Sequence, residues 1–157
     1  MARNKYPEQT VELILETARR LFLEKGYEAT TIQDIVDGLG GLTKGAVYHH
    51  FKSKADIMNA LGDKLFAEND PFRAVEGRDD LNGLEKLREV VRLHQADAEQ
   101  QQLSRESIPM LKNPRVLAEM LETNRRELTP RFLRLIEEGQ RDGSIRTGYA
   151  PELAELI

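Results

Sequence analysis

The chain has 157 residues, of which 39% are apolar and 32% charged, with no cysteine and a formal net charge of -4 at pH 7. The length suits one compact domain or one domain with a small extension, and the lack of cysteine excludes disulfide scaffolds, thiolate zinc sites and cysteine nucleophiles. Because no run of apolar residues exceeds three, we predict neither a membrane span nor a signal peptide, and we expect a cytoplasmic protein.

The first predicted element is an amphipathic helix between Pro7 and Gly26. Its apolar residues recur three and four positions apart, which is the spacing of one buried helical face. Proline suits the first turn of a helix, and glycine suits the left-handed residue that ends one. The apolar residues of this helix are Val11, Ile14, Leu15, Ala18, Leu21 and Phe22.

Three helices are predicted next, each opened by a hydroxyl side chain that can cap a helix N-terminus. Thr31 stands three residues before Asp34, and Thr43 and Ser53 precede the following two helices in the same way. The glycine pair at residues 40–41 separates the first of these helices from the second. The apolar residues are Ile35, Val36 and Leu39 in the first helix and Ile57, Leu61 and Leu65 in the last.

The next part of the chain also has helical spacing. Residues 69–71 (Asn-Asp-Pro) are expected to stop the preceding helix, and residues 77–80 to form a loop. One long amphipathic helix is then predicted, and a short segment follows between Pro109 and Pro114. The residues that mark the long helix are Leu81, Leu84, Leu87, Val91 and Ala98.

A second long helical stretch contains Pro130, where we expect a kink or a break. Three glycines are expected to mark its end, and Pro151 to start one more helix. No segment alternates with a period of two, so we predict an all-α fold. The apolar residues of the stretch are Val116, Leu117, Met120, Leu121, Leu128, Phe132, Leu135 and Ile136, and the glycines are Gly139, Gly143 and Gly148.

Within residues 27–56, two short helices joined by a glycine-containing turn match a helix-turn-helix element. The second helix of such an element must present small and polar residues, because it enters a major groove that admits one helix. Val47 and Phe51, four residues apart, would anchor this helix to the core. The small and polar residues that meet the demand are Thr43, Lys44, Gly45 and Ala46, followed by the hydrogen-bond donors Tyr48, His49 and His50.

The charge distribution favours the same segment. Residues 1–64 carry nine basic and nine acidic groups, so the whole excess of acid lies beyond residue 64. Between Asp37 and Asp56 there is no carboxylate, and a polyanion could approach there. On charge alone, a solvated loop explains this window equally well. Its basic and imidazole side chains are Lys44, His49, His50, Lys52 and Lys54.

Residues 30–36 (TTIQDIV) and 42–54 (LTKGAVYHHFKSK) resemble the tetracycline-repressor (TetR) family. The signature of that family is a T-x-x-x-I-A start, a G-[VL]-[ST]-x-G turn and a Y-x-[HY]-F-x-[ST]-K finish. The resemblance is densest over residues 10–60 and extends more loosely to residues 136–143, which look like the end of the family's seventh helix. The turn at residues 38–42 is one residue longer than the usual pattern.

The resemblance implies a set of DNA-binding residues. On the recognition helix it places Thr43, Lys44, Gly45, Ala46, Tyr48 and His49. Positions that reach the phosphate backbone are matched by Tyr27, Thr31, His50 and Lys54. The residue types alone leave alternatives open: Tyr48 could pack against the first helix, His49 and His50 could be a surface pair, and Lys52 could be a solvated charge.

The resemblance further implies a ligand-responsive regulator, expected to be a repressor, that binds a palindromic operator in double-stranded DNA as a homodimer and is released by a small-molecule effector. Residues 1–52 would form the DNA-binding domain and residues 53–157 the helical effector-binding and dimerisation domain. We expect the latter to be truncated at its C-terminus, because family members are usually longer.

The candidate effector-binding residues lie on the predicted helices after residue 60. They are Leu61, Leu65, Leu87, Val91, His94, Met110, Met120 and Asn124. Their apolar majority suits a hydrophobic or aromatic effector. The same residues also suit an ordinary core, with His94 at its rim and the methionines filling gaps.

A function of another class remains open, namely a helical protein-interaction adaptor in which the helix-turn-helix is only structural. Enzyme functions find no support in the sequence. No histidine follows a glutamate three residues earlier, as a carboxylate-bridged metal bundle requires, there is no Gly-x-Ser-x-Gly elbow, and residues 40–45 lack the order of a phosphate-binding loop. We therefore predict no catalysis, no metal and no cofactor.

Overall fold

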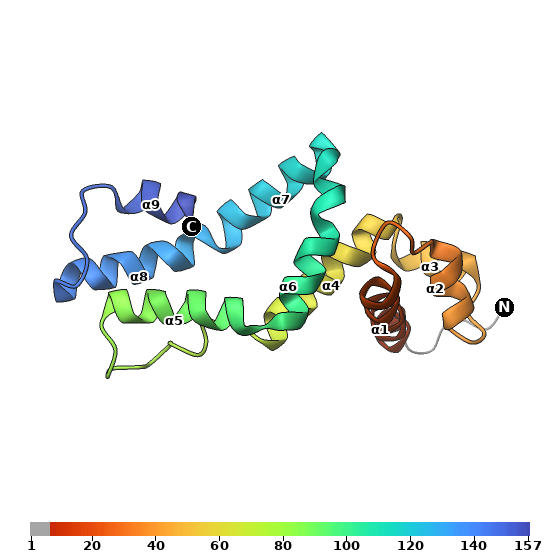
Figure 1. Ribbon diagram of the computed structural model, residues 1–157, viewed down its shortest axis with the longest axis horizontal. Helices are drawn as coiled ribbons and strands as arrows, with labels where there is room; N and C mark the ends of the chain where they lie inside the picture. The colour runs from red at the N-terminus through yellow and green to blue at the C-terminus, as the bar shows by residue number, and fades with distance from the viewer. Residues whose placement is uncertain (1–6) are drawn as a thin grey trace. The chain divides into compact units, whose positions relative to one another are not determined.

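The computed structural model describes residues 7–157, and this range contains helices and no strands (Figure 1). The predicted all-α class is confirmed. No helix within these residues is long and apolar enough to cross a membrane. In chain order the elements are α1 (Pro7–Lys25), α2 (Ile32–Gly38), α3 (Lys44–His50), α4 (Lys54–Glu68), α5 (Gly83–Ala96), α6 (Ala98–Ser107), the 3-10 helix η1 (Ile108–Lys112), α7 (Pro114–Glu127), α8 (Thr129–Asp142) and α9 (Ala150–Leu156).

The helices fall into two compact units. The first unit contains α1 to α4 together with α6, and the second unit contains α5, α7, α8 and α9. The functional division predicted from the sequence lies at residue 52, and residues 1–6 of that predicted first domain lie outside the described residues. The compact units differ from this division, because α4 and α6 pack with the N-terminal helices. The division at residue 52 stays a prediction about function.

The core of the first unit is built on α1. Ile14, Ala18 and Phe22 have no exposed surface, and Ile35 of α2 and Val47 of α3 are equally buried. All five occupy positions that the helical periodicity assigned to buried faces. Since burying one such side chain contributes about 1.5–3 kcal/mol, this shared core supplies most of what holds the short helices α2 and α3 in place.

The helix ends of the first unit follow the predicted capping chemistry. Thr31, Thr43 and Ser53 each accept a hydrogen bond on the side-chain oxygen from the backbone N–H three residues later, at 3.0, 3.2 and 3.1 Å respectively. Gly26 ends α1 with φ +83°, the left-handed conformation that glycine adopts without strain. The sequence therefore determined where these helices begin and end.

In the second unit, α5 and α8 approach each other through two glycines. A Cβ on Gly83 would lie 2.1 Å from the backbone N of Gly139 and 2.8 Å from the backbone O of Leu135. One turn along α5, the buried Lys86 forms an ion pair with Glu138 of α8. The backbone N–H of Gly83 also donates to Asp142 at 2.7 Å. The two helices therefore meet at backbone distance and are fixed in register by a part-buried charge pair.

The other face of α8 packs against α9. The buried residues of this cluster are Ile136, Ala150 and Ala154, and the partly buried residues around it are Phe132, Leu133 and Ile145. The predicted break at Pro130 is confirmed, because α7 ends at Glu127 and α8 begins at Thr129. The predicted helix start at Pro151 is also confirmed, since the proline lies in the first turn of α9.

The prediction of one long helix over residues 81–98 is wrong. α5 ends at Ala96, Asp97 is extended with ψ 90°, and α6 begins at the next residue. Residues 92–102 contain few large apolar side chains, so no continuous buried stripe holds them in one helix. The side chain of Asn69 donates to the Asp97 carboxylate at 3.1 Å and thereby stabilises the break.

Two further details of the second unit differ from expectation. The most buried face of α5 carries Lys86 and Val90, whereas the predicted apolar residues Leu87 and Val91 are only half-buried. Of the glycines expected to mark the end of this stretch, Gly143 ends α8 as predicted with φ +83°, whereas Gly139 is a buried residue inside the helix. The glycine inside α8 permits the close approach of α5.

We predict that Gly83→Ala destabilises the second unit by about 1–3 kcal/mol, because the new Cβ can be accommodated only if α5 and α8 separate. The matched control is Gly62→Ala on α4, where a Cβ meets nothing within 4 Å; this variant should be neutral or stabilised by up to about 1 kcal/mol, because alanine favours the helix. Urea unfolding followed by circular dichroism measures both. Equal stability of the two variants would contradict the close contact.

Candidate nucleic-acid interface

The helix-turn-helix is formed by α2, α3 and the turn between them. Gly40 and Gly41 have φ values of +60° and +138°, which side-chain-bearing residues rarely adopt, so the glycine pair sets the course of the turn. Thr43 then caps α3 through its hydrogen bond from the backbone N of Ala46 at 3.2 Å. The predicted turn and the predicted start of the second helix are thus both present.

One face of α3 is buried and the opposite face is exposed. Val47 is completely buried and Phe51 is 8% exposed, so these two residues anchor the helix as predicted. Tyr48 is 45% exposed, which leaves its ring accessible rather than packed inside. The other outward residues are Thr43, Lys44, Gly45 and His49, which are exposed, and Ala46 and His50, which are half-buried.

Around Gly45 and the two histidines, α3 presents an unobstructed edge. A Cβ on Gly45 would have Thr43 Oγ1, at 3.8 Å, as its nearest neighbour, so the backbone can be approached closely from outside. The rings of His49 and His50 contact each other edge to face with centroids 5.1 Å apart. The structure therefore brings the predicted recognition-helix residues together on one outward surface.

The turn after α1 places Tyr27 in a different setting. The Tyr27 ring packs against Phe22 with centroids 5.4 Å apart, and the ammonium of Lys54 lies 4.2 Å from the ring centroid. Burial raises the pKa of the Tyr27 hydroxyl. The backbone N–H of Tyr27 donates to Glu106 of α6 at 2.9 Å. Tyr27 is therefore held by neighbours on three helices of the first unit.

Lys54 and Thr31, both predicted to reach phosphates, have polar groups that are hydrogen-bonded to other groups of the protein. The Lys54 ammonium donates to the backbone oxygens of Tyr27, Glu28 and Thr30, the last at 2.7 Å, and burial lowers its pKa. The Thr31 hydroxyl donates to the Asp34 carboxylate at 2.7 Å and accepts from the Asp34 backbone N–H at 3.0 Å. This geometry favours a supporting role for Lys54, and its contact with phosphate stays a prediction.

No sequence pattern singles out Glu106, which is 79 residues from its partner in the turn. A glutamate in a polar helix is ordinarily a solvated charge, and only the folded arrangement brings it to the turn after α1. Lys54 was identified as a basic residue near the predicted interface, but its carbonyl partners could not be read from the sequence.

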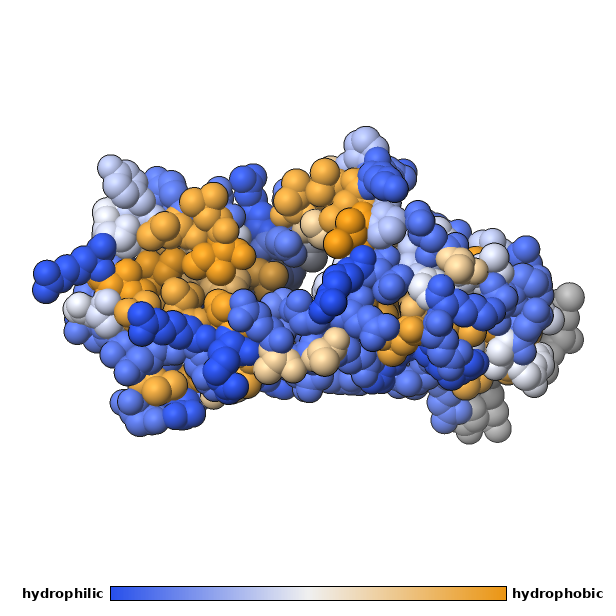
Figure 2. All heavy atoms as spheres, in the orientation of Figure 1, coloured by the Kyte–Doolittle hydropathy of each residue, from blue (hydrophilic) through white to orange (hydrophobic). Residues whose placement is uncertain are grey.

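The predicted effector-binding residues are divided between the two units. In the first unit Leu61, Leu65 and Met110 are buried core residues; in the second unit Leu87 and Val91 are half-buried, and His94, Met120 and Asn124 are exposed. Figure 2 shows apolar side chains gathered on the surface of the second unit. Leu153 and Leu156 of α9 and the following residue Ile157 are exposed. An effector role for the eight residues stays a prediction.

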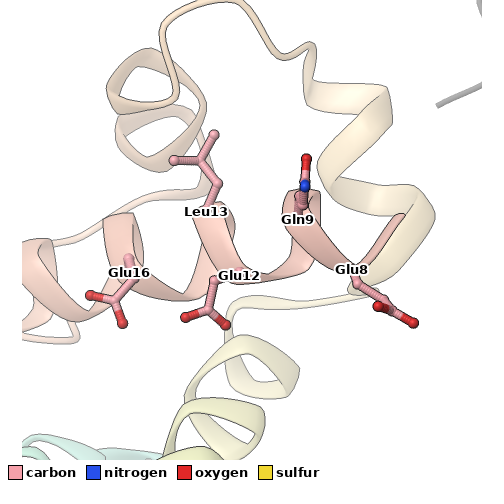
Figure 3. A pocket seen from close by; sticks show the side chains of 5 residues that line it. All are labelled: Glu8, Gln9, Glu12, Leu13 and Glu16. Atoms are coloured by element: carbon pink, nitrogen blue, oxygen red, sulfur yellow. The ribbon is translucent and has the colours of Figure 1, made fainter. Parts of the chain in front are cut away.

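A shallow hollow lies along the outer side of α1, and the sequence analysis did not single it out. It is lined by Glu8, Gln9, Glu12, Leu13 and Glu16, with the three carboxylates on one side of the helix and Leu13 on the other (Figure 3). Glu12 and Glu16 both bind Lys64 of α4. This acidic side of α1 is unsuited to a phosphate backbone. Among residues 7–157, no group of three or more His, Asp or Glu side chains is arranged to hold a metal ion.

Comparison with known proteins places this geometry among bacterial regulators. Residues 14–61 match the sequence profile described as bacterial regulatory proteins, tetR family. The chain is 35% identical over 152 residues to the HTH-type transcriptional repressor KstR2 of Rhodococcus jostii, a match that covers 90% of this chain and 70% of KstR2. A solved structure of a regulatory protein in the tetR family from Rhodococcus RHA1 superposes with a TM-score of 0.65 at 25% identity, covering 94% of this chain and 78% of that one.

Other relatives match over a shorter part of the chain. The probable HTH-type transcriptional regulator ArpR of Pseudomonas putida is 39% identical over 85 residues, which are 54% of this chain and 40% of ArpR. In that match the chain therefore spans less than half the length of its relative.

Hydrogen bonds from the hydroxyl and the backbone N–H of Thr31, together with Lys25, lower the pKa of Asp34 to about 2. Because this pKa lies below that of an unfolded aspartate, the capping box stabilises the folded chain fully above about pH 4 and loses its effect as the pH falls toward 2. We predict that NMR titration gives the Asp34 carboxyl a pKa of about 2, and that Thr31→Val raises this pKa toward the ordinary range. Thr43→Val, which removes only the cap of α3, should leave the Asp34 pKa unchanged.

Proposed function

Because the chain belongs to the TetR family of bacterial regulatory proteins, we propose that it is a DNA-binding transcription regulator that represses its target genes. It would bind a palindromic operator as a homodimer, with two recognition helices in successive major grooves roughly 34–36 Å apart. A regulator of this kind works where the chromosome is, in the cytoplasm.

The observation that carries the proposal is the outward face of α3. This face combines an anchored helix, a glycine at its first turn and polar side chains, and residues 38–55 contain no carboxylate. Such a surface suits a groove lined by phosphates, because small residues permit close approach and the lack of acid avoids repulsion. The net charge of the chain is negative, but residues 38–55, which include the proposed DNA-facing surface, carry no acid.

We assign two kinds of contact to this interface. The proposed base contacts come from the exposed polar residues of α3, and the positive end of the helix together with His50 would hold phosphates. Tyr27 and Thr31 flank the turn after α1 and would meet the phosphate backbone there. The proposed base-contacting residues are Thr43, Lys44, Gly45, Ala46, Tyr48 and His49.

The proposed regulation uses a small-molecule effector held by the helices after residue 60. The apolar majority of the candidate residues suits a hydrophobic or aromatic effector. Such an effector releases the DNA only if it binds the released state more tightly than the DNA-bound state, because a ligand with equal affinity for both states shifts nothing. The name of KstR2, a transcriptional repressor, supports repression over activation.

The direct test is selection of bound fragments from randomised double-stranded DNA with the purified chain, followed by gel shifts at several salt concentrations. We expect a palindromic consensus and salt-sensitive, sequence-selective binding. Gly45→Leu should abolish this binding while leaving the helicity intact, because the new side chain finds open space in the protein and would collide with the groove.

Two outcomes would contradict the proposal. Normal binding by Gly45→Leu would show that α3 does not dock in a groove. Absence of any DNA binding at low salt would favour the alternative function, a helical adaptor in which the helix-turn-helix is structural.

For Lys54→Ala we predict uniformly weaker binding to all DNA sequences, a lower melting temperature and an unchanged salt dependence. The reason is that the ammonium of Lys54 is occupied by backbone oxygens of residues 27–30. The control is Lys44→Ala on the exposed start of α3, which should reduce the slope of log affinity against log salt by about one unit. A similar loss of slope for Lys54→Ala would assign Lys54 a phosphate contact after all.

A further inference from the structure

Three side chains of α6 attach this helix to α1 and to the turn that follows it. Glu99 forms an ion pair with Arg19, with one of its two hydrogen bonds 2.7 Å long. The side-chain amide of Gln102 donates to the backbone O of Leu23 at 3.3 Å. Glu106 accepts from the backbone N of Tyr27 at 2.9 Å. The three residues are spaced three and four apart and therefore lie on one face of α6.

Glu106 differs from the other two because it holds a backbone group of the turn itself. A carboxylate that accepts a backbone N–H makes one of the stronger hydrogen bonds available to a protein. The same carboxylate lies against Gly26, where a Cβ would come within 2.9 Å of Glu106 Oε2. Gly26 therefore suits the turn for two reasons: its φ is +83°, and its lack of a side chain leaves space for the Glu106 carboxylate.

The turn is held from its other side by Lys54 of α4, whose ammonium donates to the backbone oxygens of Tyr27, Glu28 and Thr30. An acid from α6 therefore holds the N–H of the turn, and a base from α4 holds its carbonyls. We call this arrangement the turn clasp, made of Glu106, Lys54 and the backbone of residues 26–30. Immediately after it comes Thr31, which caps the N-terminus of α2.

We propose that Glu106 is a positioning residue for DNA binding, which acts by holding the turn at residues 26–30 in the conformation that presents Tyr27 and Thr31 to the phosphate backbone. This inference rests on the proposed function. The negative charge of Glu106 repels the phosphates of DNA, and this repulsion acts over distances up to a Debye length of about 8–10 Å. Glu106 therefore favours DNA binding only through the geometry of the turn.

The two effects of Glu106 have opposite signs, and a substitution separates them. If only charge matters, Glu106→Ala binds the operator as tightly as the wild type or more tightly. If the turn clasp positions the interface, Glu106→Ala binds about tenfold more weakly, the loss expected for one charge-assisted hydrogen bond. Glu106→Gln, which removes the charge but keeps an acceptor oxygen, should stay within about twofold of the wild type.

Glu99→Ala is the matched control. It removes the same charge from the same face of α6 and breaks the ion pair with Arg19, but it does not touch the turn. We expect its operator affinity to equal or exceed that of the wild type. If Glu99→Ala weakens binding as much as Glu106→Ala does, Glu106 acts by general attachment of α6, and the proposal is overturned.

A second measurement needs no DNA. Hydrogen exchange of the backbone amides at residues 26–31 should speed up in Glu106→Ala and stay slow in Glu106→Gln and Glu99→Ala. Should Glu106→Ala fail to fold, Glu106→Asp provides the test, because it keeps the charge and shortens the reach; it should show both the faster exchange and the weaker binding.

The outcomes also separate this inference from the proposed function. A wild-type chain that binds no DNA defeats the proposed function, whatever the exchange data show. A wild-type chain that binds its operator, with Glu106→Ala and Glu106→Asp binding as tightly and exchanging as slowly as the wild type, defeats the role of Glu106 alone.

Discussion

The interface depends on the burial of one face of a helix that is too short to be stable alone. α2 and α3 have seven residues each, and isolated helices below about 12–15 residues are marginal in water. Val47 and Ile35, both without exposed surface, attach these helices to the core around α1. Every outward residue of α3 takes its position from that attachment, so the site is a consequence of the core.

The charges of the first unit complement this arrangement. On the outer side of α1, Glu12 and Glu16 are gathered around Lys64, whereas α3 and the turn before it carry no acid. Acids near the interface have fixed partners: Asp34 is held by Thr31 and Lys25, and the carboxylate of Asp56 accepts the backbone N–H of Lys52 at 3.0 Å. The net charge of the chain therefore says little about what its surfaces can approach.

Local chemistry made much of this structure predictable. Hydroxyl caps, glycine stops and apolar spacing depend on residues within four positions of each other, and they located α1 to α4 and the break before α8. Features that depend on distant partners were not predictable. The break at Asp97, the buried Lys86 and the hold of Glu106 on the turn each require a residue from another helix, and no periodicity in the sequence encodes such a meeting. The predicted DNA and effector contacts involve partners outside the chain, so they remain proposals.

The contact between Gly83 and Gly139 has a mechanical consequence for the second unit. Where helices meet through long side chains, small displacements are absorbed by changes of rotamer, and the neighbouring helix stays where it is. Here backbone meets backbone, and no side chain lies between the two glycines to yield. A displacement of α5 at this point must therefore displace α8 as well, because closely packed interiors transmit strain. We expect the α5–α8 pair to move as one rigid body.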